Sequence, residues 1–156
     1  MRWTYLIALG SNRRGHHGGP DDEVRTAALA IGASAMSPII ASAAVGPSLR
    51  RYANAVARVE CALTPPALLA RLKQVEHAFG RRRGQRWSAR VIDLDIILWS
   101  GGGWRSPGLT VPHAAFRDRP FVLAPLLALA PGWRDPQTGL TIRQLHRRLT
   151  RPRPLA

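Results

Sequence analysis

Alternating and helical spacings of apolar residues divide this chain into an ordered series of short elements. The apolar run Tyr5–Leu9 predicts a strand, and Gly10-Ser11-Asn12 after it predicts a turn. Ser37–Val45 predicts a second strand and Arg51–Leu63 a third, with clear alternation. Arg90–Trp99 is strongly β-forming and predicts a fourth. The chain therefore contains material for a small sheet.

Helical spacing occupies the intervals between these strands and the C-terminal part of the chain. The acidic run at 21–23 predicts the start of a helix that extends to about Ile31, because carboxylates stabilise a helix N-terminus. Thr64 caps a second helix, in which Leu68, Leu72 and Phe79 recur at 3.6-residue spacing, and Gly80 ends it. Two further helices are predicted at Phe121–Leu129 and Ile142–Leu149.

The order of elements is β, α, β, β, α, β, followed by additional C-terminal pieces. This order predicts a ferredoxin-like α+β fold, in which helices pack on one face of an antiparallel sheet. The C-terminal helices favour a third layer, which would give an α/β/α arrangement. The segments 13–20 and 80–87 are expected to be loops, and Gly101-Gly102-Gly103 to break the regular structure. We expect one domain over residues 1–150 and a loose tail over 151–156.

Composition is consistent with a single folded domain. The chain has 156 residues, of which 46% are hydrophobic and 21% charged, so a disordered chain is disfavoured. Cys61 is the only cysteine, which excludes an intramolecular disulfide and favours a reducing, cytoplasmic location. The apolar run Trp3–Leu9 is too short for a signal-peptide core or a membrane span.

The charge indicates an anionic partner. The formal net charge is +14, from 23 Lys and Arg against 9 Asp and Glu, and Lys73 is the only lysine. Arginine grips phosphate with a planar, bidentate fork. Charge alone leaves a nucleotide, a nucleic acid and an anionic membrane open, as well as arginines that only solvate the surface.

Two acids in the fourth predicted strand are the most specific chemical feature. Side chains two apart in a strand share a face, so Asp93 and Asp95 project together while Ile92, Leu94 and Ile96 fill the opposite face. Neighbouring carboxylates repel unless a cation lies between them, and oxygen ligands favour Mg²⁺. The alternative is that each acid pairs with an arginine such as Arg90.

Basic and polar residues nearby extend this hypothesis. The glycine-flanked loop before Arg90 carries four arginines and can fold over a triphosphate, although such loops alone also suit solvated turns. His113 precedes further arginines, and Asn54 sits inside a strand, where asparagine is disfavoured unless its amide has a role such as reading a flat heterocycle. His16-His17 could bind a metal ion, but a surface loop is the simpler interpretation.

Six segments in order make the chain similar to the 6-hydroxymethyl-7,8-dihydropterin pyrophosphokinase family. They are Ala8-Leu9-Gly10-Ser11-Asn12, Tyr52-x-Asn54-Ala55-Val56, Leu68-Leu69 through Glu76 to Gly80-Arg81, Arg86-Trp87-x-x-Arg90-x-x-Asp93-Leu94-Asp95, Leu109-Thr110-Val111-Pro112-His113, and Arg119-x-Phe121-Val122-Leu123-x-Pro125-Leu126. The resemblance implies transfer of diphosphate from ATP to the pterin hydroxyl, a step of folate synthesis.

The resemblance also assigns roles to individual residues. Asp93 and Asp95 would hold two Mg²⁺ ions, while Arg81 and Arg90 would stabilise the transferring phosphoryl group. The residues around ATP would be Glu76, Arg82, Arg83, Arg86, Trp87, His113 and Arg119, and the order of Arg82 and Arg83 on the phosphates stays open. The residues around the pterin would be Val45, Tyr52, Asn54 and Phe121.

Two other functions remain to be distinguished from this one. A basic ferredoxin-like sheet could bind RNA, but Asp93 and Asp95 would repel a nucleic-acid backbone, so nucleic acid is disfavoured. A catalytically silent relative would bind both ligands without releasing AMP. The expected partners are ATP and the hydroxymethyl-dihydropterin, with no membrane, and the expected state is a monomer.

Overall fold

A computed structural model describes residues 1–42, 51–80 and 90–152 of the chain. The five-stranded sheet is built from β1 (Trp3–Ser11), β2 (Ala33–Met36), β3 (Ile40–Ser42), β4 (Tyr52–Cys61) and β5 (Asp93–Trp99). A separate hairpin is formed by β6 (Trp104–Ser106) and β7 (Leu109–Val111). The helices are α1 (Pro20–Ala30), α2 (Pro65–Ala78), α3 (Pro120–Leu129) and α4 (Ile142–Thr150), with the short 3₁₀ helix η1 (Phe116–Asp118) before α3.

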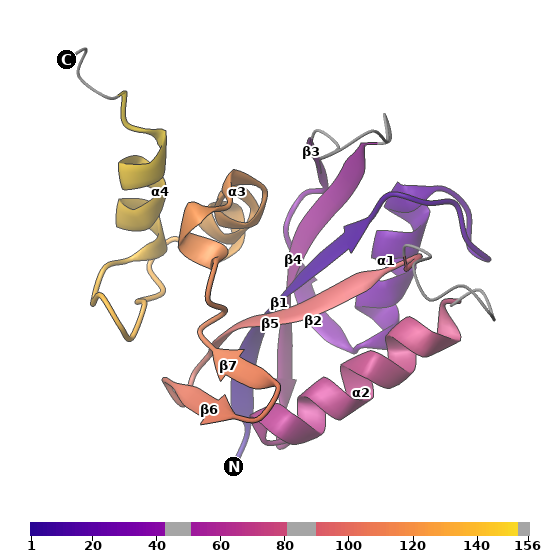
Figure 1. Cartoon of the computed structure of the whole chain (residues 1–156), viewed down its shortest axis with the longest axis horizontal. Coiled ribbons are helices and arrows are strands. Elements are labelled where there is room, and N and C mark those ends of the chain that lie inside the picture. Colours follow the sequence, from indigo (N-terminus) through magenta and orange to yellow (C-terminus); the bar gives the residue numbers. More distant parts are fainter. Residues whose placement is uncertain (43–50, 81–89, 153–156) are drawn as a thin grey trace.

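The sheet has the order β2-β4-β1-β5, and β3 pairs with β4 beside β2 (Figure 1). All of the pairings are antiparallel. If β2 and β3 are taken as one interrupted edge strand, the order is that of the predicted ferredoxin-like sandwich, which is thereby confirmed. β1 is central, so its residues from Tyr5 to Gly10 lie between partners on β4 and β5.

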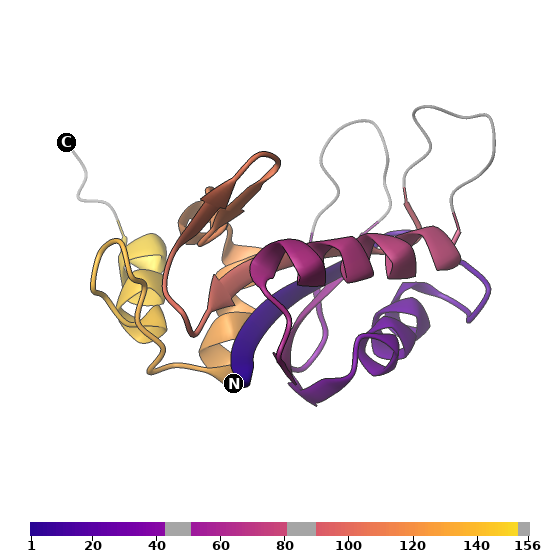
Figure 2. The same ribbon diagram turned by 90° about the horizontal axis from the view of Figure 1, so that it is seen from below.

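Two helices cover one face of the sheet. The inward residues of β1, among them Tyr5, Ile7 and Leu9, pack with Val24 and Ala27 of α1 and with residues of α2. The Tyr5 hydroxyl donates to the Leu63 carbonyl (2.6 Å), and burial raises the pKa of this phenol to about 12, with Cys61 adding to the rise. In Figure 2, α1 and α2 lie on one side of β1, and α3 and α4 lie on the other.

The C-terminal helices cover the other face. Leu6, Val56 and Ile97 point from the sheet toward a second cluster, in which Leu123 and Leu126 of α3 are fully buried. α4 packs behind α3 through Ile142 and Leu145, whereas its remaining surface is polar. The predicted third layer is therefore confirmed (Figure 1). No helix within the described ranges combines the length and the apolar character needed to cross a membrane.

Two predicted boundaries were wrong. The strand expected over 37–45 instead begins at Ala33 and breaks at Ser37-Pro38, where proline cannot donate to the ladder and Ser37 pairs with Val56 through both its N–H and its hydroxyl. The turn expected at Gly10 is absent, because Gly10 pairs with both β4 and β5 and β1 continues to Ser11. The glycine run 101–103 does interrupt the regular structure after β5, as expected, but the β6–β7 hairpin that follows it was not predicted.

The loop that contains His16-His17 is tied to α1. Glu23 is fully buried, and its carboxylate accepts hydrogen bonds from the His17 backbone N–H (2.7 Å) and pairs with the His17 Nδ1 (2.9 Å). The His17 ring also packs on Phe79, with 4.7 Å between ring centroids. Among the described residues, no group of three or more His, Cys, Asp or Glu is placed to hold a metal ion. His17 therefore fastens this loop.

Candidate active site

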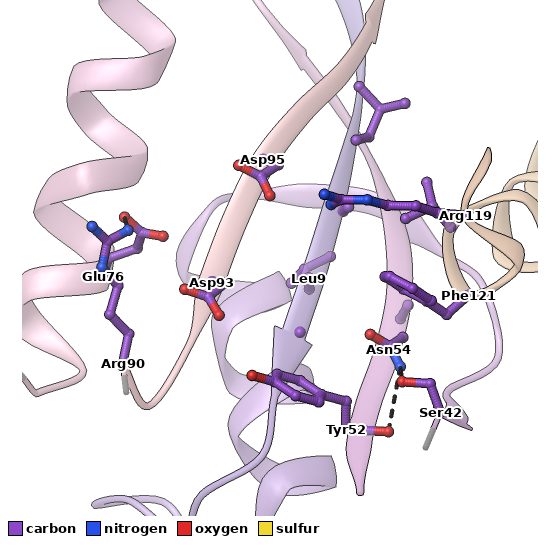
Figure 3. A pocket seen from close by; sticks show the side chains of 15 residues that line it. Leu9, Ser42, Tyr52, Asn54, Glu76, Arg90, Asp93, Asp95, Arg119 and Phe121 are labelled. Carbon is purple, nitrogen blue, oxygen red and sulfur yellow. Dashed lines mark hydrogen bonds and ion pairs between the residues drawn. The ribbon is translucent and has the colours of Figure 1, made fainter. Parts of the chain in front are cut away.

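A cavity of about 530 Å³ opens where β1, β4 and β5 meet α2 and the start of α3 (Figure 3). Its lining combines small residues of the sheet, aromatic rings and charged groups. Among the lining residues are several that the sequence predicted for the site, namely Tyr52, Asn54, Glu76, Arg90, Asp93, Asp95, Arg119 and Phe121. Residues from β1, β3, β4, β5, α2 and α3 thus converge on one site.

The two acids of β5 share the face that borders this cavity. Leu94 and Ile96 are buried in the first core, so alternation turns Asp93 and Asp95 to the opposite side, where Asp95 is exposed. On β1, Asp93 faces Gly10, which has no side chain, and Asp95 faces Ala8, which has only a methyl group. These two positions leave space above the sheet. The predicted common face is confirmed.

Neither acid forms an ion pair with another described residue. Arg90, the partner considered from sequence, instead donates to Glu76 through its Nη1 (3.2 Å). Glu76 is 7% exposed, and its second carboxylate oxygen accepts the Leu94 N–H at 2.9 Å. Glu76 therefore clamps the backbone between the two aspartates and holds Arg90 beside them.

Burial and the neighbouring carboxylates change the titration of Asp93. Burial raises the pKa of Asp93 to about 6, with Glu76 and Asp95 adding to the rise and Arg90 opposing it. A carboxyl group that is partly buried beside two other carboxylates is stabilised by a cation. Asp93 and Asp95 are therefore the described side chains best placed to hold one.

The opposite side of the cavity presents an amide between aromatic residues. Asn54 is 6% exposed, and its Nδ2 donates to the Ser42 hydroxyl (2.8 Å) and to the Tyr52 carbonyl (3.3 Å). Its Oδ1 lies toward Gly10, 3.5 Å from where a Cβ would stand. Tyr52 and Phe121 enter the cavity from β4 and α3 on either side of this amide (Figure 3).

The segment between β7 and α3 adds cationic and imidazole groups. The Arg119 guanidinium lies 5.9 Å from the Phe121 ring centroid and lines the cavity. His113 is not among the lining residues, but its Nδ1 accepts the Ala115 N–H at 3.2 Å, which leaves the proton on Nε2. Burial lowers the pKa of His113; Asp95 opposes this and Arg119 adds to it. His113 is thus a neutral donor near the cavity.

Several predicted site residues cannot be placed. Val45 and the basic-loop residues Arg81, Arg82, Arg83, Arg86 and Trp87 lie outside the described residues. Sequence reasoning missed Ser42, which orients the Asn54 amide, and the space provided by Ala8 and Gly10. The sequence carries no local signal for Ser42, because its contact with Asn54 depends on the register of β3 against β4.

Comparison with known proteins gives consistent results. A sequence model described as 7,8-dihydro-6-hydroxymethylpterin-pyrophosphokinase matches residues 6–131. The 2-amino-4-hydroxy-6-hydroxymethyldihydropteridine pyrophosphokinase of Haemophilus influenzae is 34% identical over 134 residues, which cover 81% of each chain. The Synechocystis protein of the same name is 42% identical over 104 residues, covering 67% of this chain and 53% of that one.

Solved structures have the same fold. The crystal structure of Plasmodium falciparum HPPK-DHPS with pteroate superposes with a TM-score of 0.73 at 12% identity, covering 95% of this chain and 44% of that one. This chain thus spans about half the length of the Synechocystis relative and less than half of the Plasmodium protein. From the match over residues 6–131 and the Haemophilus relative, we conclude that the chain belongs to the 7,8-dihydro-6-hydroxymethylpterin-pyrophosphokinase family.

Proposed function

We propose that this chain transfers a diphosphate group from ATP to 6-hydroxymethyl-7,8-dihydropterin, releasing AMP and the pterin diphosphate in folate biosynthesis. The observation that carries the proposal is one cavity with two aspartates on one side and an amide between two aromatic residues on the other. The first side suits a phosphate chain with its cations, and the second suits a flat heterocycle. The names of the family and its relatives give the same activity.

The reaction joins the two ligands in line. The hydroxymethyl oxygen attacks the β-phosphorus of ATP, the bond from that phosphorus to the oxygen shared with the α-phosphorus breaks, and AMP leaves with that oxygen. The hydroxyl proton passes to solvent. Such a transfer needs orientation and neutralisation of charge more than covalent participation by the protein. Arg90 and Arg119, both lining the cavity, are placed to bind phosphate oxygens, and we assign the same task to Arg81.

The described acids fit Mg²⁺. Magnesium is typically held by one or two carboxylates together with substrate phosphates and water, so a dyad without a third protein carboxylate is suitable. The raised pKa of Asp93 reflects burial first and the like charges of Glu76 and Asp95 second, and a divalent cation would offset both. When bound, two Mg²⁺ ions would neutralise the phosphate chain. Asp93 and Asp95 would hold them.

The remaining assignments follow the two sides of the cavity. Asn54 would read the amide-like edge of the pterin, while Tyr52 and Phe121 stack on its faces. Glu76 and His113 would lie near the nucleotide, together with Arg82, Arg83, Arg86 and Trp87. Val45 would contribute backbone groups to the pterin. A cytoplasmic location, a monomeric state and a single domain over residues 1–150 remain predictions from sequence.

The test is direct measurement of product. The protein is incubated with ATP, Mg²⁺ and 6-hydroxymethyl-7,8-dihydropterin, and AMP is quantified. We expect AMP only when all three are present, and Asp95→Ala to reduce turnover by several orders of magnitude. Glu60→Gln, an exposed acid on β4, is the matched control and should retain full turnover. Full activity in folded Asp95→Ala would refute the cation assignment.

Two outcomes would replace the proposal. Binding of both ligands without AMP would identify a catalytically silent relative. Salt-sensitive binding of oligonucleotides without ATP turnover would identify a nucleic-acid-binding module instead, as the net charge of +14 permits.

A further inference from the structure

A buried ion pair that does not line the cavity joins η1 to the turn between α3 and α4. Asp135 is fully buried and accepts Arg117 Nε at 2.6 Å and Arg117 Nη2 at 2.7 Å. The same carboxylate accepts the Gln137 N–H (3.0 Å) and the Thr138 hydroxyl (2.7 Å). Burial alone would raise the pKa of Asp135, but these hydrogen bonds and the Arg117 charge lower it to about 2. The pair is therefore ionised at neutral pH.

Asp135 is held by a closed turn. Its own N–H donates to the Leu140 carbonyl (2.8 Å), and its carbonyl accepts the Gly139 N–H (2.8 Å). The Ile142 N–H then donates to the Trp133 carbonyl (2.9 Å), which fixes the turn to the start of α4. The carboxylate consequently has a fixed position relative to α4, which itself packs on η1 and α3.

Arg117 connects this turn to the segment that carries Arg119. Its guanidinium stacks over the Phe116 ring at 4.6 Å from the centroid, and Phe116 is fully buried in the second core. The Phe116 carbonyl accepts the Arg119 N–H at 3.4 Å. The Arg119 carbonyl accepts the N–H groups of Val122 (3.0 Å) and Leu123 (2.9 Å). Arg119 is thus the junction between η1 and α3.

Apart from the buried Phe116, the short 3₁₀ helix is held by weak hydrogen bonds of its own. η1 contains three residues, and its N–H bonds are long, 3.3 Å from Phe116 to His113 and 3.2 Å from Asp118 to Ala115. The bidentate pair, in contrast, has two short charge-assisted bonds. The strongest polar constraint on η1 in the described chain therefore comes from Asp135, which lies beyond residues 6–131, where the family model matches.

We propose that Arg117 and Asp135 form a positioning pair, through which the α3–α4 turn fixes Arg119 for binding the phosphates of ATP. This inference rests on the proposed function. Arg117 faces the turn rather than the cavity, so its effect on the reaction passes through the backbone of η1. The start of α3, which carries Phe121, is held separately by the packing of Val122 and Leu123 in the second core.

The test separates positioning from simple stability. In Asp135→Asn and Arg117→Gln we expect kcat/KM for ATP to fall about tenfold, whereas KM for the pterin, measured at saturating ATP, changes less than twofold. The double variant should lose no more than either single variant, because the two residues act as one unit. Arg117→Lys, which keeps the charge but not the bidentate fork, should lie between wild type and Arg117→Gln.

Two controls share the region but not the pair. Thr138→Ala removes one donor to the same carboxylate, and Leu145→Ala loosens the packing of α4. Both should lower the melting temperature while leaving kcat/KM for ATP within twofold of wild type, when assayed well below that temperature. A positioning role would be refuted if Asp135→Asn impaired the use of ATP and of the pterin equally. It would also be refuted if Leu145→Ala lowered kcat/KM for ATP as much as Asp135→Asn does.

Failure of this inference is distinguishable from failure of the proposed function. If wild type forms AMP and folded Asp135→Asn does so with unchanged kcat/KM for ATP, only the positioning role is refuted. If wild type neither binds ATP nor forms AMP, the proposed function fails and this inference fails with it.

Discussion

Replacing Asp93 by asparagine should stabilise the metal-free protein while destroying its activity. The carboxylate is partly buried beside Glu76 and Asp95, and its pKa rises from an ordinary 3.8 to about 6. At neutral pH the folded protein must therefore ionise a group that is easier to ionise in the unfolded chain. Asparagine has nearly the same shape without the charge, so Asp93→Asn removes this cost.

The size of the effect follows from the pKa. A rise from 3.8 to about 6 corresponds to about 3 kcal/mol, since one pKa unit is worth about 1.4 kcal/mol. Solvent reaches part of the carboxylate and screens its neighbours, so we expect about 1–2 kcal/mol for Asp93→Asn at pH 7.5. For a chain of this size, that is a rise of several degrees in melting temperature.

The gain should depend on pH in a defined direction. Between pH 3.8 and 6 the folded state binds more protons at Asp93 than the unfolded state does, so this residue makes the wild type less stable as pH rises through that window. The cost is complete above pH 6 and disappears below 3.8. The advantage of Asp93→Asn should therefore be largest at pH 7.5 and shrink toward pH 4.

Urea unfolding in EDTA, followed by tryptophan fluorescence, measures this difference. Glu60→Gln removes an exposed carboxylate of the same sheet and should change the free energy of unfolding by less than about 0.5 kcal/mol at either pH. Adding Mg²⁺ and ATP should reverse the order by stabilising only the wild type. A destabilised Asp93→Asn at pH 7.5, or a gain that persists at pH 4, would show that the buried charge of Asp93 does not cost the fold stability.

Three further outcomes are expected. Asn54→Ala should raise the Kd of the pterin at least tenfold more than that of ATP in calorimetric titration, since its amide faces the heterocycle side of the cavity; equal losses would contradict that role. Glu23→Gln should lower the free energy of unfolding by about 1–3 kcal/mol in urea titration, because the fully buried carboxylate accepts from His17, and an unchanged midpoint would show that the pair is dispensable. Leu123→Ala, at a fully buried position between sheet and α3, should cost about 2–5 kcal/mol in the same assay, and a loss below 1 kcal/mol would mean that this layer is loosely packed.

The spacing of apolar residues correctly predicted the helices and strands that bury only one face. β5 alternates buried and open positions without interruption from Asp93 to Ile96, and α2 buries Leu68 and Leu72 at helical spacing. In these segments the local pattern and the tertiary contacts agree, so residue spacing alone identified both the element and its inward side.

Prediction failed where tertiary pairing overrode a local signal. Gly10 in a Gly-Ser-Asn run indicates a turn, but partners on both sides, Asn54 and Asp93, extend β1 through it. The hairpin strands β6 and β7 have three residues each and depend on Trp104 and Val111 reaching the first core, a contact that no short window of sequence reveals. The local sequence pattern therefore could not predict strand boundaries that depend on pairing or packing with residues far away in the chain.

The same distinction applies to the site. The common face of Asp93 and Asp95 followed from a period of two, because that geometry is local. The partner of Arg90 did not, because Glu76 lies fourteen positions earlier on a helix and only the packing of α2 on β5 brings the two together. Likewise, Ser42 and Asn54 meet across a strand pair whose register the sequence did not specify.

The use of acids in this basic chain gives an independent reason to regard the dyad as functional. With 23 basic residues against nine acids, pairing a carboxylate is easy, and each fully or nearly fully buried acid in the described chain is paired: Glu23 with His17, Glu76 with Arg90, Asp135 with Arg117. Asp93 lies next to the guanidinium of Arg90, yet that group pairs with Glu76, so Asp93 keeps a raised pKa beside Asp95. Selection for stability alone would remove such an arrangement, because Asp93→Asn is expected to stabilise the fold. The charge is therefore best explained by a ligand that needs it, and a divalent cation on a phosphate chain meets that requirement.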